Sequence, residues 1–337
     1  HEFQLTAAGT ALLTAYRPLD CDLVSVGGRP LSAVTDSLFQ EIDVRTGLVM
    51  YEWDSLDHVP LSESYSSPSG SSTHWPFDFF HLNSINLNAD GTLLISSRNT
   101  WAAYEIDPHT GQVLWTLGGK ASSFTEGRGA ATAYQHDARP TAPGQISLFD
   151  NGSFPQVHAQ SRGVVLTVDA QTHTVSVLEQ FLHPGRPLLA DSQGNLQALG
   201  HGDWFVGWGQ ERYFSEFGAH STLLFDASLP QGYESYRALS FNDWNATPTS
   251  APALALRSGS SGVAAYASWN GATTVARWEV LYGPSSTALR PVQTAAPSGF
   301  ETSIALGKRS GGVVEVRALD ARGRVLGTSA AQALSRS

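Results

Sequence analysis

A hairpin whose first strand opens on a polar residue recurs along the first two thirds of the chain. The segments HEFQL, HLNSINL, HDARP and QGNLQAL begin at His1, His81, His136 and Gln193, and each leads through a glycine turn to an apolar segment: ALLTAY, LLISSR, ISLFD or WFVGW. Repeated hairpins that cannot bury a face alone stack side by side and predict a radial array of sheets, a β-propeller. The first strands would point at one axis, so these four residues are expected to converge.

A second pair of strands completes each unit. Its turn reads D-x-x-T-G at Asp43 and at Asp107, with weaker copies in LTVDAQTHTVSVLEQF and FSEFGAHSTLLFDA. Four strands per unit are typical of a propeller blade, so about four blades are predicted over residues 1–245. The first unit is lengthened by a polar loop, LDHVPLSESYSSPSGSSTHWPFD, which is expected at the surface. Its Tyr65, His74 and Trp75 are candidates to cover an aromatic substrate.

Composition shifts after about Trp244. Residues 246–253 are small residues and prolines, which predicts a linker. Residues 254–335 form short alternating segments separated by glycine turns, a pattern close to that of a fibronectin type III-like β-sandwich. Trp269 and Trp278 are expected to lie in the core of this sandwich.

Composition and charge narrow the class further. The 32 glycines and the low share of charged residues, 15%, favour an all-β protein over a helical one. A net charge of −10 argues against a nucleic-acid partner, although a few local cations can still hold one small anion. Cys21 is the only cysteine, so neither an intrachain disulfide nor a cysteine-based metal site is possible. No apolar run approaches the roughly 20 residues of a membrane span.

These segments resemble a known family. The run FHLNSINLNADGTLLISSRNTWAAYEIDPHTGQVLWTLGGK, followed by YQHDARP, ISLFDNG and VGWG, is similar to the arylsulfotransferases, which take sulfate from an aryl sulfate ester rather than from a nucleotide. The resemblance extends over nearly the whole chain, the C-terminal sandwich included. It implies an aryl sulfate donor, a phenolic acceptor, no cofactor, and a secreted or periplasmic location.

The resemblance also implies a larger propeller than the repeats account for. Members of the family have six blades, whereas this chain supplies four and the segment YRALSFNDW. The chain is therefore expected to be a C-terminal portion of a longer protein. A second polypeptide that supplies the missing blades is one expected partner.

Sulfuryl transfer between two phenols sets its own chemical requirements. The transferred SO3 unit carries charge on three oxygens, much as in phosphoryl transfer. A nucleophile divides the exchange into two steps, and a neutral imidazole is suited to this role. Cationic or N–H donors must hold the sulfuryl oxygens, for which arginine offers a planar fork. A proton source must meet the departing phenolate.

The resemblance assigns catalytic roles to three of the repeated residues. The motif QHDARP makes His136 the nucleophile, which becomes a transient sulfohistidine. The motifs HLNS and HEFQ place His81 and His1 beside it. Oxyanion binding and protonation of the phenolate are assigned to these two histidines jointly, and the division of the roles between them is left open. The return strand LLISSR brings Arg98 to the same end of its hairpin, where it would hold sulfate and lower the pKa of His136.

Three amide residues are the predicted substrate-binding residues. Asn83 lies two residues after His81, on the same strand face. Gln193 and Asn195 occupy the equivalent place in the fourth blade, where an amide can line the channel but cannot act as a nucleophile.

Structural roles stand beside these interpretations. Arg98 can instead pair with an acid between blades, and Arg139 is expected to do so. Asp137 either orients His136 or caps a turn. The remaining histidines fall in predicted loops and are expected to face solvent: His58, His74, His109, His158, His173, His183, His201 and His220.

Two other functions fit parts of the pattern. Three convergent imidazoles also suit zinc or copper, but no H-x-H or H-x3-H spacing supports this, and no metal is expected. The other alternative is a non-catalytic propeller that presents a binding surface.

Overall fold

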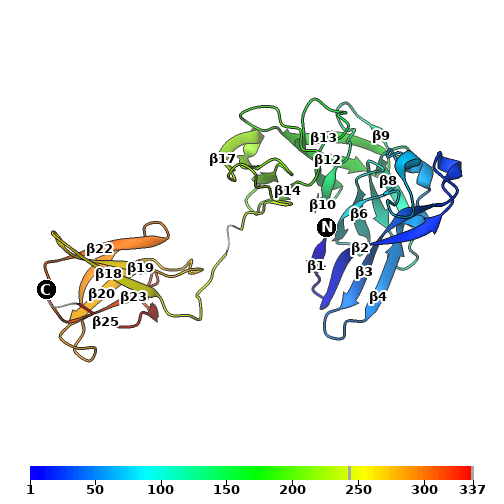
Figure 1. The fold of residues 1–337 in the computed structure, drawn as a ribbon. Helices are drawn as coiled ribbons and strands as arrows, with labels where there is room; N and C mark the ends of the chain where they lie inside the picture. Colours follow the sequence, from blue (N-terminus) through cyan, green and yellow to red (C-terminus); the bar gives the residue numbers. More distant parts are fainter. Residues whose placement is uncertain (242–243, 335–337) are drawn as a thin grey trace. The chain divides into compact units, whose positions relative to one another are not determined.

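The computed structural model describes residues 1–241 and 244–334. It divides into two compact units, His1–Ser240 and Phe241–Ser337, and nearly all regular structure in both is strand (Figure 1). The prediction of an all-β protein is confirmed. Ser335, the predicted end of the sandwich, and Asn242 and Asp243 of YRALSFNDW lie outside the described residues. Within the described part, no helix has the length and apolar character needed to cross a membrane.

The first unit contains four antiparallel sheets, each of four strands in chain order. The third sheet has one more short strand, β9, which runs parallel to its outer strand. The strands of the four sheets are, in turn, β1 Phe3–Leu5, β2 Thr10–Cys21, β3 Ser32–Asp43 and β4 Val49–Asp54; β5 Leu82–Leu87, β6 Leu93–Ser97, β7 Ala102–Ile106 and β8 Val113–Gly118; β9 Thr125–Glu126, β10 His136–Ala142, β11 Gln145–Asp150, β12 Arg162–Asp169 and β13 Thr174–Phe181; and β14 Asn195–Ala198, β15 Trp204–Gly207, β16 Tyr213–Gly218 and β17 Thr222–Ser228.

The repeated D-x-x-T-G sequences form the turns between the outer strands. Asp43 Oδ1 accepts hydrogen bonds from the backbone N–H and the hydroxyl of Thr46, at 2.7 and 2.9 Å. Gly47 follows with a φ of +72°, a left-handed backbone conformation that residues with a side chain rarely adopt. In the Asp107 turn the carboxylate accepts from the His109 backbone N–H at 2.8 Å and from the Thr110 hydroxyl at 2.9 Å. Local hydrogen bonding thus sets the spacing of the outer strands in the first two sheets.

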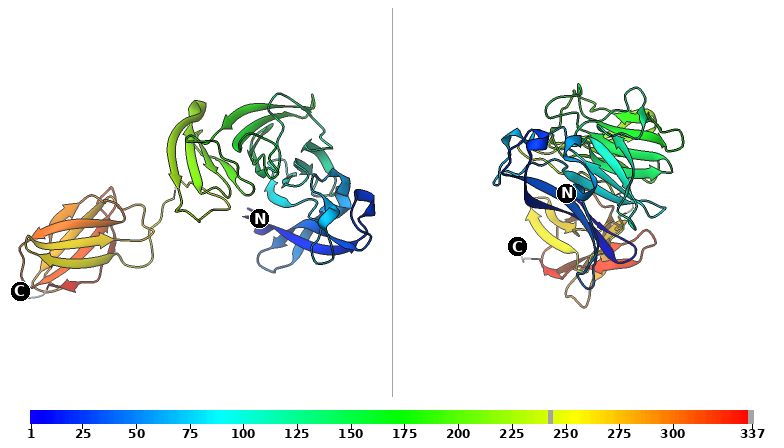
Figure 2. Two further views of the ribbon diagram at one scale, coloured as in Figure 1. Left: turned by 45° about the horizontal axis from the view of Figure 1, so that its top comes forward. Right: turned by 90° about the vertical axis from the view of Figure 1, so that its right-hand side faces the viewer.

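Alternation along the strands stacks the sheets face to face. Leu93 and Ile95 of β6 pack toward the first sheet, in a core shared with Phe39 of β3. Leu94 between them packs toward the third sheet, in a core shared with Leu148 of β11. Because both faces of a sheet are covered by neighbouring sheets, the four sheets follow one another around a common axis as propeller blades (Figure 2).

The Ser-rich insertion between the first two blades is folded against them. Val59 and Phe77 are buried in the core of these blades, and Thr35 of β3 donates a backbone hydrogen bond to Phe77 at 2.9 Å. The described helices are short. Three of them belong to the insertion and the residue before it: α1 Ser55–His58, η2 Leu61–Glu63 and η3 Pro68–Gly70. The other two lie elsewhere in the first unit: η1 Val24–Val26 and η4 Ala219–Ser221.

A further segment, Tyr236–Ser240, lies along the innermost strand of the fourth blade. The Asn195 side chain bonds both backbone groups of Ala238, at 2.7 and 2.8 Å, and the Gln197 side chain bonds both backbone groups of Ser240. This segment therefore takes the place of the inner strand of a next blade. No finding supports the second polypeptide that the sequence predicted.

The second unit consists of two antiparallel sheets with one core between them. Trp269 and Trp278 both belong to this core, as predicted. The residues predicted as the linker hydrogen-bond to this unit, since Trp269 Nε1 donates to the Ser250 carbonyl at 2.8 Å. The strands of the two sheets are β18 Ala253–Gly259, β19 Gly262–Ser268 and β22 Glu301–Gly307; and β20 Arg277–Gly283, β21 Arg290–Ala295, β23 Val313–Leu319, β24 Val325–Thr328 and β25 Gln332–Ala333.

Candidate functional site

Ring side chains from distant parts of the sequence meet at the inner ends of the blades. The imidazole of His1 lies 4.8 Å from that of His81 and 5.4 Å from the Tyr236 ring, measured between ring centroids. Tyr236 lies in turn 6.4 Å from His136. The three histidines thus border one site. Tyr236, which the sequence analysis did not single out, is in contact with two of them.

The hairpin of the second blade brings Arg98 to this site. The Arg98 backbone N–H donates to the His81 carbonyl at 3.0 Å, which ties the return strand to the start of the first. Arg98 Nη2 donates to the Asp191 carbonyl at 2.9 Å, and the guanidinium lies 4.6 Å from the centroid of the Tyr134 ring. Among the described residues Arg98 forms no ion pair with an acid, so its charge is not neutralised by a carboxylate contact.

His136, the first residue of β10, is fixed in one tautomer. Its Nδ1 lies 2.8 Å from Asn151 Oδ1 and 3.1 Å from the Tyr134 carbonyl. The Asn151 amide nitrogen donates to the Ala190 and Gln193 carbonyls, so the oxygen must face His136. Since both neighbours of Nδ1 are acceptors, Nδ1 carries the hydrogen. Nε2 keeps its lone pair and accepts only a long, 3.3 Å hydrogen bond from the Gln193 backbone.

The electrostatic surroundings keep His136 neutral. Burial lowers its pKa to about 3, and the nearby charges of His81 and Arg98 add to this, whereas the Asn151 hydrogen bond opposes it. The sequence analysis predicted that Arg98 lowers the pKa of His136, but burial lowers this pKa more. Burial also lowers the pKa of Arg98, which remains a cation because guanidinium does not deprotonate in proteins.

The other two imidazoles are also held through Nδ1. His81 Nδ1 donates to Asp78 Oδ2 at 2.5 Å. His1 Nδ1 lies 2.7 Å from the Tyr16 hydroxyl, whose own hydrogen goes to the Leu82 carbonyl, so His1 Nδ1 is the donor. In all three histidines Nδ1 is therefore used for positioning. Among the described residues only the long bond from Gln193 to His136 occupies an Nε2 of the three, so these nitrogens can serve a ligand or a proton.

Two of the predicted substrate-binding amides are used for structure. Asn83 and Asn195 are both fully buried. The Asn83 amide donates to the Gln135 carbonyl at 2.9 Å and accepts from the Asp137 N–H at 3.3 Å, which links two blades. Asn195 makes the corresponding bonds to Ala238. Their polar atoms hold neighbouring inner strands together, so the geometry does not present them to a substrate.

Gln193 remains beside the site. Its backbone N–H faces His136 Nε2, and its side-chain nitrogen lies 3.3 Å from Glu234 Oε1. Its Oε1 is buried and has no hydrogen-bond partner among the described residues. A buried acceptor without a donor is costly unless a ligand supplies one.

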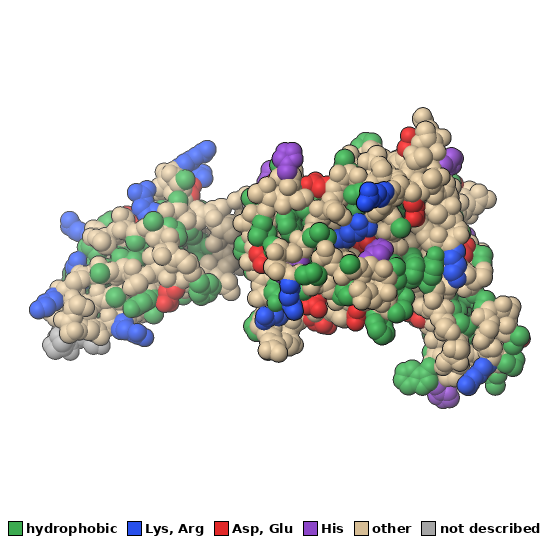
Figure 3. Space-filling view, turned by 90° about the horizontal axis from the view of Figure 1, so that it is seen from above, with side chains coloured by type: hydrophobic (Ala, Val, Ile, Leu, Met, Phe, Trp, Pro, Cys, Tyr) green, Lys and Arg blue, Asp and Glu red, His purple; other side chains and the backbone are tan. Residues whose placement is uncertain are grey.

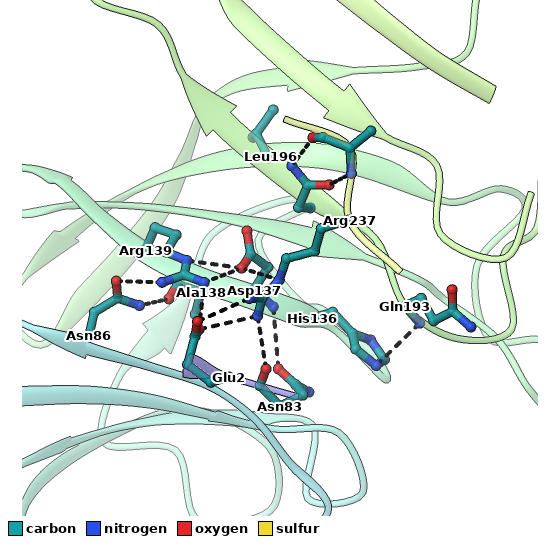
Figure 4. A network of polar contacts seen from close by, with 12 residues as sticks. Glu2, Asn83, Asn86, His136, Asp137, Ala138, Arg139, Gln193, Leu196 and Arg237 are labelled. Carbon is teal, nitrogen blue, oxygen red and sulfur yellow. Dashed lines mark hydrogen bonds and ion pairs between the residues drawn. The ribbon is translucent and has the colours of Figure 1, made fainter. Parts of the chain in front are cut away.

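Two arginines and two carboxylates form a charge cluster next to the histidines, which we call the charge clasp: Glu2, Asp137, Arg139 and Arg237 (Figure 4). Arg139 contacts Glu2 and Asp137 at 2.5 and 2.6 Å, which confirms its predicted structural ion pair. Arg237 contacts both Glu2 oxygens, at 3.1 and 3.2 Å, and its Nε lies 2.9 Å from Asp137 Oδ1. Asp137 therefore serves the clasp, which joins the first and third blades to the segment after the fourth. Arg139 also donates to Asn86 Oδ1 of the second blade, at 2.8 Å.

A cavity of about 300 Å³ opens next to Arg98. Its lining combines the Ser-rich insertion with residues of the site: Ser66, Ser67, Gly70, Ser71, Trp75, Pro76, Phe77, Asp78, Arg98 and Asn99. Trp75 is 77% exposed and free to contact a ring. Tyr65, in contrast, stacks on Trp101 at 3.6 Å between centroids and supports the scaffold. On the propeller face seen in Figure 3, a histidine lies beside basic side chains.

The histidines of the site are too far apart for a common metal ion. In the part of the chain that the structure describes, the group whose ligand atoms come within 4.8 Å of one another is His201, Asp203 and Glu216, not the three site histidines. Zinc–nitrogen bonds of about 2.0–2.1 Å would require much closer nitrogens. The geometry does not favour the metal interpretation.

Sequence reasoning missed four residues of the site: Tyr16, Asp78, Asn151 and Tyr236. A signal existed for Asn151, because it follows the strand ISLFD as Arg98 follows LLISS. The prediction that His183 faces solvent is wrong. It is buried and packs edge-on against Tyr213, with ring centroids 4.7 Å apart.

Comparisons with known proteins place the first unit in a family. The model described as "Arylsulfotransferase (ASST)" matches residues 1–229. The match ends before the sandwich, so the resemblance covers less of the chain than the sequence analysis expected. None of the curated proteins that were compared matches the chain.

Solved structures are similar only at low identity. A protein of unknown function from Bacteroides caccae is 13% identical, with a TM-score of 0.38, over 89% of this chain and 83% of that one. The extracellular domain of a proposed one-component system from B. thetaiotaomicron is 8% identical, with a TM-score of 0.41, over 99% of this chain and 43% of that one. At these TM-scores the likeness carries no argument about function.

Proposed function

The chain belongs to the arylsulfotransferase family, and from this premise we propose that it moves a sulfuryl group from an aryl sulfate ester to a phenol through a sulfohistidine at His136. The observation that carries the proposal is the state of His136. It is neutral, its Nδ1 hydrogen is fixed by Asn151, and its Nε2 lone pair lies in the site. A nucleophile needs this combination of orientation and protonation state.

The first half-reaction uses the lone pair of His136. Nε2 attacks the sulfur, and an N–S bond forms as the S–O bond to the aryl group breaks. The departing phenolate takes a proton from Nε2 of His1 or His81, whose rings are held through Nδ1. The N–H groups that Arg98 does not use for Asn99 and Asp191 bind the sulfuryl oxygens.

The second half-reaction reverses these steps with a new phenol. The acceptor hydroxyl gives its proton to the same imidazole, and its oxygen attacks the sulfur. The N–S bond breaks, and the electron pair returns to His136 Nε2. Gln193 Oε1, buried and without a donor, suits the hydroxyl of the incoming phenol. The cavity between Arg98 and Trp75 is the proposed place for an aryl ring.

The proposal extends to substrates and location at the level of the family. Aryl sulfates and phenols are the substrates that the family suggests. A secreted or periplasmic location fits the same family, and we propose it on that ground alone. Asn83 and Asn195 are given structural roles, because their hydrogen bonds are already used between strands.

A donor that reports on its own cleavage tests the proposed function. With p-nitrophenyl sulfate, we expect release of nitrophenol that depends on an added phenol and requires no nucleotide. The sulfated acceptor should appear in equal amount, measured by chromatography. Release that is independent of the acceptor would identify a sulfatase, and no release would favour the binding module.

Arg98 provides a more specific prediction. Arg98→Ala should lower kcat by about 10²–10³-fold, as loss of one oxyanion donor does elsewhere. Arg98→Lys should recover only part of this, because an ammonium cannot reproduce the planar fork. Steady-state kinetics with the exposed Arg128→Ala as control measures both effects. An Arg98→Lys enzyme as fast as the wild type would contradict the role of the fork.

A further inference from the structure

Tyr236 carries a buried polar group that no residue in the described part of the chain satisfies. Its hydroxyl oxygen is inaccessible to solvent and has no hydrogen-bond partner among the described residues. The ring lies 5.4 Å from His1 and 6.4 Å from His136, between centroids, so the Tyr236 side chain borders the site. Buried hydroxyls are nearly always hydrogen-bonded, and an unsatisfied one needs an explanation.

The backbone around Tyr236 is held from both sides. The Tyr236 carbonyl accepts from the Gly194 N–H at 3.0 Å, and Ala238 is bonded twice by Asn195. Between them, Arg237 is anchored in the charge clasp (Figure 4). These contacts hold in place the backbone that carries the phenol ring. A donor fixed in advance is what stabilisation of developing charge requires.

The protonation state suits a donor. Burial raises the pKa of Tyr236 above its ordinary value, and Arg237 opposes this only in part. The raised pKa favours the hydroxyl over the phenolate. The hydroxyl can donate a hydrogen bond, but it is too weak an acid to protonate a phenolate.

We propose that Tyr236 is a catalytic residue that donates a hydrogen bond to an oxygen of the sulfuryl group held between His1 and His136. The inference rests on the proposed function, because it assigns the unsatisfied hydroxyl to the group transferred there. Arg98 reaches the group from the second blade, and Tyr236 reaches it from the segment after the fourth. The same contact serves both half-reactions, since the sulfuryl group stays on His136 between them.

The decisive variant is Tyr236→Phe. It keeps the ring contacts and removes a hydroxyl that has no partner, so the protein should fold with an unchanged or higher melting temperature. We expect kcat to fall about 10²–10³-fold. Tyr233→Phe is the matched control, because Tyr233 lies three residues before Tyr236 but is 67% exposed. Equal rates for wild type and Tyr236→Phe would overturn the inference.

A binding measurement separates this inference from the proposed function. Inorganic sulfate, titrated by calorimetry, should bind Tyr236→Phe at least about tenfold more weakly than the wild type, on the basis of one lost charge-assisted hydrogen bond. Weaker binding by Tyr236→Phe supports the contact even if the wild type transfers no sulfate. Absence of transfer would contradict only the proposed function. Equal sulfate affinity in both proteins would exclude the contact.

Discussion

Replacing His136 by alanine is expected to abolish sulfuryl transfer, with a fall in kcat on the order of 10⁴–10⁶-fold, the range seen when a nucleophile or its partner is removed. The reason is geometric. Of the three site histidines, only His136 is buried with a fixed Nδ1 hydrogen and an Nε2 lone pair that accepts no more than a long hydrogen bond, whereas His1 and His81 are placed to carry protons. Both half-reactions should be lost, because no other residue holds the intermediate.

The intermediate itself is the sharper measurement. Intact-protein mass after brief mixing with an aryl sulfate, without acceptor, should show one added SO3 in the wild type and none in His136→Ala. His109→Ala is the control, because His109 is exposed in the Asp107 turn. An adduct that persists in His136→Ala would show that another side chain is the nucleophile.

The propeller was predictable because its determinants are local. Asp43 and Asp107 close their turns with bonds to residues two or three positions on, and the apolar residues of β6 alternate toward two neighbouring sheets. Each signal lies within one hairpin of the sequence. Repetition of that hairpin implied the radial arrangement, and with it the meeting of His1 and His81.

The roles of the amides were not predictable from the same pattern. The two-residue period of a strand predicts that Asn83 lies on the same face as His81. It does not predict which residues contact that face. In the structure it meets the backbone of the next inner strand, which satisfies both ends of the amide. Gln193 differs because only its nitrogen finds a protein partner. Contacts with the neighbouring blade decide whether such an amide holds strands together or faces a substrate. A single sequence does not reveal those contacts.

The sequence analysis predicted the ion pair of Arg139, but it missed Tyr236 and Arg237 for a related reason. The segment YRALSFNDW has no hairpin of its own, so it offered no repeat to recognise. Its importance comes from contacts more than 200 residues away in sequence, where Arg237 reaches Glu2. Those contacts also fix the distance between Tyr236 and the histidines. The stability of the clasp and the geometry of the site are therefore linked.

Arg237→Ala should lower the free energy of unfolding of the first unit by about 3–5 kcal/mol, the usual cost of removing one partner from a buried ion pair. Glu2 and Asp137 are 9% and 4% exposed, so they would lose a cation without gaining water. Arg139 cannot compensate, because it already contacts both carboxylates. Native-state hydrogen exchange followed by mass spectrometry measures the change peptide by peptide, and peptides of the second unit serve as an internal reference.

Two further variants test whether the loss comes from the clasp. Arg186→Ala removes an arginine whose side chain is 64% exposed and whose acid, Glu211, is 4.0 Å away. It should cost less than about 1 kcal/mol, as exposed pairs do. Adding Glu2→Gln to Arg237→Ala should cost less than the sum of the single changes, because the unpaired charge is then removed as well. If Arg237→Ala costs no more than Arg186→Ala, Arg237 does not hold the inner strands together. The position of Tyr236 must then depend on the bond from Gly194 to its carbonyl and on the bonds of Asn195 to Ala238.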